Sequence, residues 1–464
     1  MLVMKFGGTS VGNAAAISQT ADILAEHSTR GQVVGVVSAM SGITNTLLGK
    51  ASAAAAGDSD GVDAARAALL APHRAALVEL LPAGDRRRET EAQLGALADE
   101  VARLLYSVYV LRELSPRASD RIASFGERMS SVVVAAVLNE RGVPAQAVPA
   151  DRLIVTDSHY GNASPLLDQT RVQAQRTLQP IFDAGLLPVV TGFFGADVHG
   201  ITATLGRGGS DYSAAILGSV LDASEIWIWT DVDGVLTADP RLVPEAQTLS
   251  AVSYAEATEL AYFGAKVIHP KTMQPAVDRA IPIWIKNTFN PQVPGTRIGV
   301  ESESGHLAKA ITSIGGLAAV TVEGGGQIGV SDVTARVFGA VARTDANVYM
   351  ISQASSQHSV TFIVGGSSAD QVLTALETEF EQDITRRRLQ SITIGRDLAI
   401  VAVVGAGMRG TPGVAGRIFG TMGDEQVNIV AIAQGSSELN ISFAIGAADT
   451  NRAVTALHRA FVQG

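Results

Sequence analysis

The residues best suited to chemistry form a glycine-rich turn, Gly206-Arg207-Gly208-Gly209, which is followed by Ser210 and Asp211. Glycine lets the backbone curl so that successive N–H groups point inward as an anion-binding nest. A following helix, which we expect Ser210 or Asp211 to cap, adds free amides and a favourable dipole. Arg207 contributes a planar guanidinium that suits a carboxylate or a phosphate. The turn predicts an anion site, although a tight strand-to-helix connection would use the same residues.

A second candidate lies near the N-terminus, where Lys5 ends an expected strand and Gly7, Gly8 and Thr9 follow it. This order is not that of a P-loop, because the spacing Gly-x4-Gly-Lys-Ser/Thr is absent. Its backbone amides can nevertheless reach phosphate oxygens while Lys5 supplies a positive charge. Taken alone, Lys5 also fits the description of a surface lysine at a strand end.

Three further segments carry polar groups after expected strands or at helix starts. Thr44 lies in a hydroxyl-rich loop, and Glu127 lies in the first turn of an expected helix. Glu127 either compensates the helix dipole or binds the ammonium of an amino acid whose carboxylate contacts Arg207. The Asp-Gly and Asp-Pro pairs between Asp231 and Arg241 are partly explained as turns.

The elements that position these residues alternate between apolar strands and helical segments. The apolar runs have few polar interruptions, and they comprise 33–37, 187–190, 225–229 and 283–285. Continuous apolar strands separated by helices are typical of a mainly parallel sheet covered on both faces. Such sheets bind ligands at the carboxyl ends of their strands. We therefore predict a three-layer α/β domain whose loops carry the site.

Composition shifts suggest the boundaries of this domain. It is expected to span 1–290, with a helical excursion at about 61–115 that is rich in Ala, Leu, Arg and Glu. Residues 291–307 are interpreted as a linker because proline and glycine concentrate at its start. Two smaller α/β units, 308–394 and 395–464, are expected after it.

The two smaller units repeat one another. Ile351–Ser356 recurs as Ile432–Ser437, and Val333–Gly339 recurs loosely as Val414–Gly420, both at an offset of 81 positions (432 less 351, 414 less 333). A constant offset indicates duplication of a β-α-β-β-α unit. The second unit lacks a final strand, and the segment 308–314 can supply it by folding back.

Bulk composition excludes several classes of function. A net charge of −10 argues against nucleic acid or an anionic membrane as the main partner. The chain has no cysteine, which excludes disulfides, thiolate catalysis and Cys-based metal sites and favours the cytoplasm. The most apolar run, 132–138, is far below the ~20 residues that span a bilayer.

The motifs together resemble those of the aspartokinase family of amino-acid kinases. They occur in that family's order and comprise KFGGTSV at 5–11, SFGERMS at 124–130, GRGGSDYSAA at 206–215, WTDVDGV with DPR at 229–241 and FGAKVIHP at 263–270. The paired repeats resemble tandem ACT domains, which have a ferredoxin-like βαββαβ fold. The regulatory half is most similar to that of bifunctional aspartokinase–homoserine dehydrogenases. The chain ends where their dehydrogenase half would start, so a monofunctional enzyme is expected.

This resemblance implies ATP-dependent phosphorylation of the L-aspartate side chain to 4-phospho-L-aspartate, with ATP and Mg²⁺ as cofactors and no metal site made by the protein itself. The step opens the aspartate-derived pathway to lysine, threonine and methionine. The implied catalytic residues are Lys5, Arg207 and Asp211. The implied aspartate-binding residues are Thr44, Glu127, Arg207, Gly208, Gly209 and Ser210. The implied nucleotide-binding residues are Lys5, Gly7, Gly8, Thr9, Thr230, Asp231, Leu236, Arg241, Lys266 and Val267. Leu236 departs from the tyrosine of many relatives, which puts an aromatic contact to the nucleotide in doubt.

The resemblance also implies feedback inhibition and self-association. Gln353 and Gln434 are expected to bind an amino-acid effector, threonine in preference to lysine, although both glutamines would also serve as partners for edge amides. A homodimer or homotetramer formed through the ACT domains is expected. The alternatives are an inactive amino-acid sensor that keeps the kinase fold, a kinase for glutamate, acetylglutamate or carbamate, and a scaffold protein.

Overall fold

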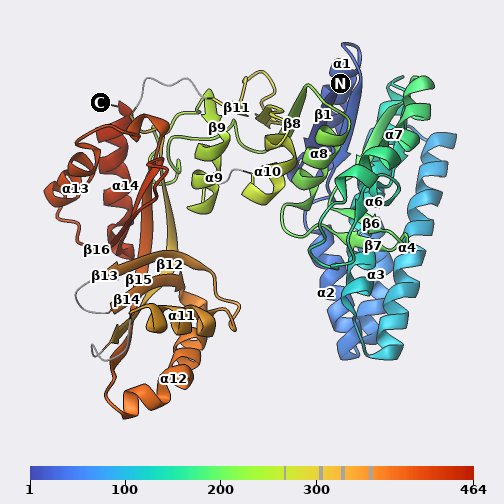
Figure 1. Cartoon of the computed structure of the whole chain (residues 1–464). Coiled ribbons are helices and arrows are strands. Elements are labelled where there is room, and N and C mark those ends of the chain that lie inside the picture. The colour runs from blue at the N-terminus through green and yellow to red at the C-terminus, as the bar shows by residue number, and fades with distance from the viewer. Residues whose placement is uncertain (266–267, 302–306, 325–329, 355–358, 464) are drawn as a thin grey trace. The chain divides into compact units, whose positions relative to one another are not determined.

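The computed structural model describes residues 1–265, 268–301, 307–324, 330–354 and 359–463. The chain divides into two compact units (Figure 1). The first holds Met1–Val235, Ser250–Tyr254 and Val267–Ser302. The second holds Leu236–Leu249, Ala255–Lys266 and Glu303–Gly464.

The first unit is built on an eight-stranded sheet. Its strands lie in the order β3 (Ala145–Val148), β5 (Leu187–Thr191), β2 (Val33–Val37), β1 (Leu2–Phe6), β8 (Glu225–Thr230), β10 (Ile283–Asn287), β11 (Thr296–Gly299) and β9 (Ala251–Ser253). All neighbours pair in parallel except β10 and β11. Every residue of β2 and β5 is buried, as expected for apolar strands covered on both faces. The predicted mainly parallel sheet is confirmed.

Helices cover this sheet and complete three layers. They comprise α1 (Ala14–Ser28), α6 (Phe125–Glu140), α7 (Leu167–Asp183), α8 (Gly209–Val220) and α10 (Pro270–Val277). Helices α1 and α6 pack on each other and on the sheet, and α8 packs on β1 and on α7 and α10. A small sheet of β4 (Val155–Thr156), β6 (Phe194–Asp197) and β7 (Thr202–Thr204) lies beside them.

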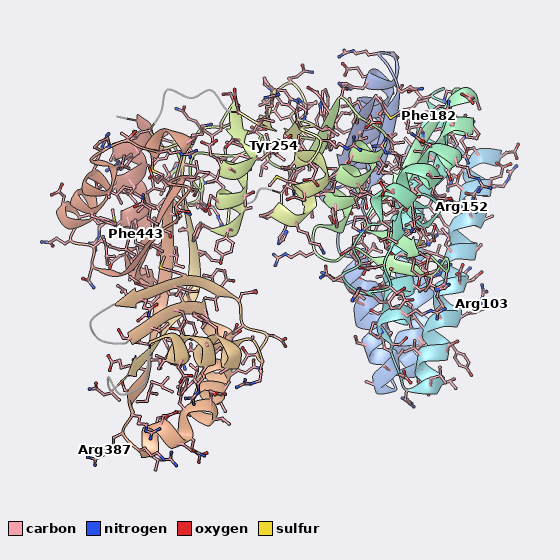
Figure 2. The ribbon with its side chains drawn as sticks, in the orientation of Figure 1. Arg103, Arg152, Phe182, Tyr254, Arg387 and Phe443 are labelled. Atoms are coloured by element: carbon pink, nitrogen blue, oxygen red, sulfur yellow. The ribbon has the colours of Figure 1, made fainter. Side chains whose placement is uncertain are left out.

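The segment after β2 forms a helical layer of its own. It comprises α2 (Ile43–Ala56), α3 (Ser59–Leu80), α4 (Asp85–Leu111) and α5 (Pro116–Ala123). The long helices α3 and α4 run side by side (Figure 1), and their apolar faces share one core with α1 and α6. Arg103 on α4 extends from the polar face of this layer (Figure 2).

The second unit is a six-stranded antiparallel sheet with helices packed on it. Its order is β13 (Val348–Ala354), β14 (Ser359–Gly365), β12 (Ala310–Gly324), β15 (Leu389–Val404), β17 (Asn440–Gly446) and β16 (Ile429–Gln434). Its main helices are α11 (Val330–Val341), α12 (Ala369–Thr385), α13 (Val414–Asp424) and α14 (Thr450–His458). Two separate apolar cores follow the two sequence repeats, with Phe362 and Phe443 fully buried at equivalent strands. Phe443 is labelled in Figure 2. The duplicated ferredoxin-like fold is confirmed.

The region between the two units differs from a plain linker. Residues 296–299 form β11, which pairs with both β10 and β9. The high Pro and Gly content of 291–295 therefore marks a turn between strands instead of a domain connection. Residues 310–314 pair with 400–404 of β15, within the sheet of the second repeat. Across the described parts of the chain, none of the helices combines the length and apolarity that crossing a membrane requires.

Candidate active site

A pocket of about 370 Å³ opens in the first unit, beside the carboxyl ends of β1 and β2. Segments far apart in the sequence meet there because parallel strands end at the same edge of the sheet. The pocket is lined by Lys5, Gly8, Ser38, Ala39, Met40, Ser41, Gly42, Thr44, Glu127, Phe193, Gly206, Arg207, Gly208, Gly209, Ser210 and Asp211. Both glycine-rich segments that the sequence singled out are thus in one place.

Lys5 and Asp211 form an ion pair in this pocket. Lys5 lies on β1 with 8% of its surface exposed, and its Nζ is 2.5 Å from Asp211 Oδ1. Asp211 lies in the first turn of α8, which begins at Gly209. Neither Ser210 nor Asp211 caps this helix, so the expected capping is wrong: Gly208 is the N-cap, and no side chain bonds to the first amides. The Asp211 carboxylate is instead directed at Lys5.

The turn before α8 depends on two glycines in the left-handed region. Gly206 has φ of +78° and Gly208 has φ of +71°, values that residues with a side chain rarely adopt. Arg207 lies between them with an exposed side chain, and it makes no ion pair within the described residues. A cationic side chain without a protein partner at the mouth of a pocket is free to bind an anionic ligand.

Glu127 supplies an acidic group to the pocket. It lies in the first turn of α6 with 3% of its surface exposed. Burial raises the pKa of its carboxyl to about 8. Its Oε2 has no hydrogen-bond partner among the residues that the structure describes. A buried carboxyl with an unused oxygen suits a ligand that brings its own cation, such as an ammonium.

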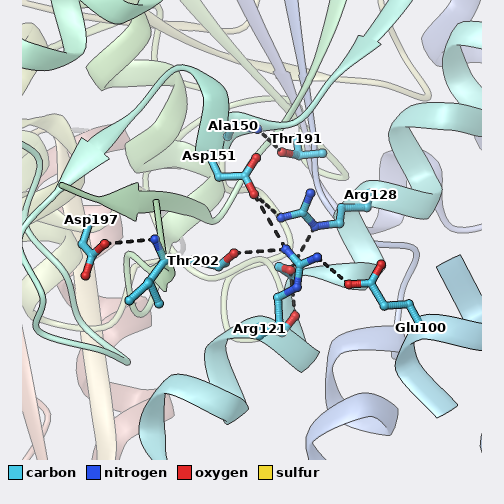
Figure 3. A network of polar contacts seen from close by, with 10 residues as sticks. Glu100, Arg121, Arg128, Ala150, Asp151, Thr191, Asp197 and Thr202 are labelled. Atoms are coloured by element: carbon cyan, nitrogen blue, oxygen red, sulfur yellow. Dashed lines mark hydrogen bonds and ion pairs between the residues drawn. The ribbon is translucent and has the colours of Figure 1, made fainter. Parts of the chain in front are cut away.

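A network of arginines and carboxylates holds the helix that carries Glu127 (Figure 3). Arg128, the next residue on α6, forms an ion pair with Asp151, and its guanidinium lies 4.7 Å from the centre of the Phe194 ring. Burial lowers the pKa of Arg128. Arg121 binds Glu100 at 2.5 Å and donates to Thr202 Oγ1 at 3.2 Å (Figure 3). Sequence reasoning did not assign a role to this network.

Thr44 and the expected residues of the N-terminal loop separate into those that line the pocket and those that do not. Thr44 lies in α2, and both it and Gly8 line the pocket. Gly7 and Thr9 do not, and the Gly7 N–H already donates to the Trp229 carbonyl at 3.1 Å. Of the two glycine amides expected at a phosphate, that of Gly7 is thus already hydrogen-bonded within the protein. The Gly7 amide instead joins the loop to β8.

The expected nucleotide-binding residues from Thr230 onward that the structure describes do not line this pocket. Thr230 is the last residue of β8 and Asp231 follows it, and Thr230 Oγ1 donates to Asp231 Oδ1 at 3.2 Å. Leu236 and Arg241 belong to the second unit, and Arg241 forms an ion pair with Asp239 at 2.6 Å. Lys266 and Val267 lie outside the described residues. No group of three or more His, Asp or Glu that could hold a metal ion occurs in the described ranges.

The two glutamines expected to bind an effector occupy equivalent positions. Gln353 lies on β13 opposite Val360, and Gln434 lies on β16 opposite Ile441. Both side chains are exposed, and both strands are edges of the six-stranded sheet. The two glutamines thus lie at equivalent positions of the two repeats, as the sequence offset predicted.

These features define an α/β protein whose mainly parallel sheet carries an anion-binding pocket, followed by two ACT-like repeats. The amino acid kinase family model matches residues 1–287, and the ACT domain model matches 320–380 and 401–461. The chain belongs to the amino acid kinase family.

Curated relatives align along almost the whole chain. The bifunctional aspartokinase/homoserine dehydrogenase 1 of Arabidopsis thaliana is 38% identical over 99% of this chain and 51% of its own length. The chain thus spans about half of the bifunctional relatives it matches. Lysine-sensitive aspartokinase 3 of Escherichia coli is 33% identical over 99% of this chain and 98% of its own length.

Solved structures of aspartokinases also match almost the whole chain. E. coli aspartokinase III in complex with aspartate and ADP has a TM-score of 0.80 at 31% identity, over 99% of both chains. Clostridium acetobutylicum aspartate kinase has a TM-score of 0.81 at 26% identity, over 99% of this chain and 100% of its own. The fold of the whole chain is that of these aspartokinases.

Proposed function

We propose that this chain is an aspartokinase, which transfers the γ-phosphoryl group of ATP to the side-chain carboxylate of L-aspartate. One observation carries the proposal: the pocket combines the Lys5–Asp211 ion pair, the unpaired Arg207 and the buried Glu127. These groups match an amino acid that presents a carboxylate, an ammonium and a second carboxylate. The binding of aspartate and ADP by the E. coli relative supports the proposal.

The substrate is held by its α groups. Arg207 and the amides of Gly208, Gly209 and Ser210 bind the α-carboxylate, and Glu127 binds the ammonium. Thr44, which lines the same pocket, donates its hydroxyl to a carboxylate oxygen. With both α groups held, the side-chain carboxylate is directed toward Lys5. A side chain one methylene longer would misplace the reacting oxygen.

The transfer step needs no general base. The aspartate side chain has an ordinary pKa of about 3.9 and is ionised at neutral pH. Its oxygen bonds to the γ-phosphorus while the bond to the β–γ bridging oxygen breaks, and that oxygen leaves with the electron pair as part of ADP. The barrier is mainly repulsion between anions, so a fixed cation lowers it. Lys5 supplies that cation, and Asp211 keeps its ammonium in place.

The nucleotide is assigned to residues of the N-terminal loop and of segments later in the chain. We assign Gly8 to the phosphates, with Gly7 and Thr9 shaping the loop, and Thr230, Asp231, Leu236, Arg241, Lys266 and Val267 to the rest of the nucleotide. Mg²⁺, when bound with the nucleotide, would neutralise part of the phosphate charge. No residue of this chain is assigned to the metal.

The ACT repeats are assigned to regulation. An amino-acid effector is proposed at Gln353 and Gln434, with threonine as the first candidate because of the resemblance to bifunctional enzymes. Lysine is the alternative, since the E. coli relative is called lysine-sensitive. Exposed apolar side chains on the edge strands β13 and β16, such as Ile351 and Ile432, support a homodimer or larger assembly through these strands.

The test is aspartate-dependent release of ADP in the presence of Mg²⁺, repeated with glutamate, threonine and lysine. The proposal predicts turnover with aspartate only, lowered by threonine. Inhibition by lysine alone would keep the reaction and replace the effector. A folded protein that binds aspartate and ATP without turnover would favour the inactive sensor, which is the second candidate function.

A further inference from the structure

A buried carboxylate in the first unit accepts three hydrogen bonds, two from backbone N–H groups and one from a side-chain hydroxyl. Asp120 lies on α5 with 4% of its surface exposed. Its Oδ2 accepts from the N–H groups of Gly161 and Thr204, both at 2.8 Å, and its Oδ1 accepts from Thr204 Oγ1 at 2.7 Å. A buried charge is tolerated only with such partners, so these bonds hold the two segments firmly together.

One segment held by Asp120 leads into the turn at Gly206, and the other lies against that turn. Thr204 is the last residue of β7, two positions before Gly206. Gly161 precedes Asn162, whose Oδ1 would lie 2.6 Å from a Cβ built on Gly206. The same Asn162 oxygen accepts from Lys271 Nζ at 2.8 Å. Gly206 is therefore enclosed by two chain segments that share one carboxylate.

We infer that Asp120 is a positioning residue for Arg207. The inference rests on the proposed function, in which Arg207 binds the α-carboxylate of the substrate. Arg207 has no ion pair among the described residues, so the backbone turn sets the direction of its side chain. If the turn is loosened, the Arg207 guanidinium is still present, but the turn and the Arg207 side chain must be ordered when the substrate binds. That cost weakens aspartate binding and leaves nucleotide binding unchanged.

Thr204 allows a test that spares the buried charge. Thr204→Val removes the hydroxyl that donates to Asp120 Oδ1 while keeping the shape, and Thr204→Ser keeps the hydroxyl. We expect Thr204→Val to raise the KM for aspartate about tenfold, since a hydrogen bond to a charged group is lost, and Thr204→Ser to stay within about twofold. The KM for ATP should change in neither variant. Asp120→Ala, which removes the acceptor of all three bonds, should have a larger effect of the same kind.

Asn139→Ala is the matched control. The Asn139 side chain bonds to the backbone N–H and carbonyl of Ala145, so its loss also frees a strand, but at β3, away from the turn. The two variants are compared at equal loss of thermal stability. If the role of Thr204 is merely structural, Asn139→Ala and Thr204→Val should have the same effect on the KM for aspartate and on the KM for ATP. That result, or equal rises in the KM for aspartate and ATP with Thr204→Val, would overturn the inference.

Amide hydrogen exchange of the ligand-free protein separates this inference from the proposed function. Thr204→Val should accelerate exchange at residues 205–210 and leave β1 unchanged. If wild-type protein fails to phosphorylate aspartate while exchange at the turn still responds, the function is wrong and the role of Asp120 in holding the turn stands. Unchanged exchange at the turn would refute that role, whatever the activity.

Discussion

Lys5 Nζ lies 2.5 Å from Asp211 Oδ1, which joins the first strand of the chain to the first turn of α8. Two motifs about 200 residues apart thereby form one charged centre at the edge of the parallel sheet. The pair is mostly shielded from solvent, which strengthens its electrostatic interaction relative to a surface pair. Arg207 and Glu127 line the same pocket.

Replacing Lys5 should act on the chemical step. Lys5→Met removes the charge that stabilises the transferring phosphoryl group and should lower kcat by about 10²–10³-fold, as for other groups of this kind. Steady-state kinetics in both substrates measure it. The matched variant Lys5→Arg keeps the charge and should retain more activity than Lys5→Met. Equal kcat values for wild type and Lys5→Met would contradict the assignment.

Replacing Arg207 should weaken the binding of aspartate and leave the binding of ATP unchanged. Arg207→Ala removes charge-assisted bonds to the α-carboxylate and should raise the KM for aspartate about 10–100-fold. The KM for ATP should remain within about twofold, since only the aspartate contact is lost. Arg207→Lys keeps the charge but not the planar fork, so it should give an intermediate KM. A similar rise in both KM values would sink the assignment.

The raised pKa of Glu127 predicts that kcat/KM for aspartate depends on pH. Burial raises the pKa of its carboxyl to about 8, so the group is mostly neutral below that pH in the empty site. The substrate ammonium needs the ionised form, so kcat/KM for aspartate should rise with pH up to about 8 and then level. Glu127→Gln should lower kcat/KM and remove this rise. A pH profile that is identical in the variant would exclude Glu127 as the group responsible.

The same carboxyl makes a prediction for stability, with the sign set by its raised pKa. Between the ordinary Glu pKa of 4.5 and about 8, the folded protein binds the Glu127 proton more tightly than the unfolded chain. Its stabilising contribution is therefore complete below 4.5 and is lost as pH rises through about 8. Denaturation of wild type and Glu127→Gln at several pH values should show a difference that changes over this range. A constant difference would contradict the raised pKa.

A buried ion pair in the second unit predicts a large stability loss. Lys309 Nζ lies 3.0 Å from Glu256 Oε2, and both side chains are almost fully buried. Lys309→Ala leaves the Glu256 carboxylate buried without this partner and should destabilise the unit by about 3–5 kcal/mol in denaturant unfolding. The exposed pair Arg30–Glu26 is the control, and Arg30→Ala should cost no more than about 1 kcal/mol. Equal losses in the two variants would contradict the argument.

Part of the site could be predicted from where its residues lie along the chain. Lys5 lies near the carboxyl end of the parallel strand β1, where such sheets bind ligands. Glu127 and Arg207 lie at or just before the starts of α6 and α8. The 81-residue offset likewise predicted the paired folds and the equivalent places of Gln353 and Gln434.

Other features depend on contacts that no local pattern reveals. Asp120 bonds to Thr204 across 84 positions, and Lys309 pairs with Glu256 across 53, so neither has a sequence motif around it. The hydrogen bond of the Gly7 amide was not predicted because its acceptor, the Trp229 carbonyl, lies on a strand more than 200 residues away. Strand β11 was hidden by the adjacent Pro-Gly turn. Such features follow from tertiary packing and not from local sequence.

The measurement that tests the central claim most directly is trapping of the acyl phosphate with hydroxylamine, in the presence of ATP and Mg²⁺. L-aspartate is compared with succinate, which lacks the ammonium, and β-alanine, which lacks the α-carboxylate. We predict aspartyl hydroxamate from L-aspartate and only a small fraction of that rate from either analogue, because Glu127 and Arg207 each lose their ligand. No hydroxamate from L-aspartate, or equal rates with succinate and β-alanine, would contradict this account.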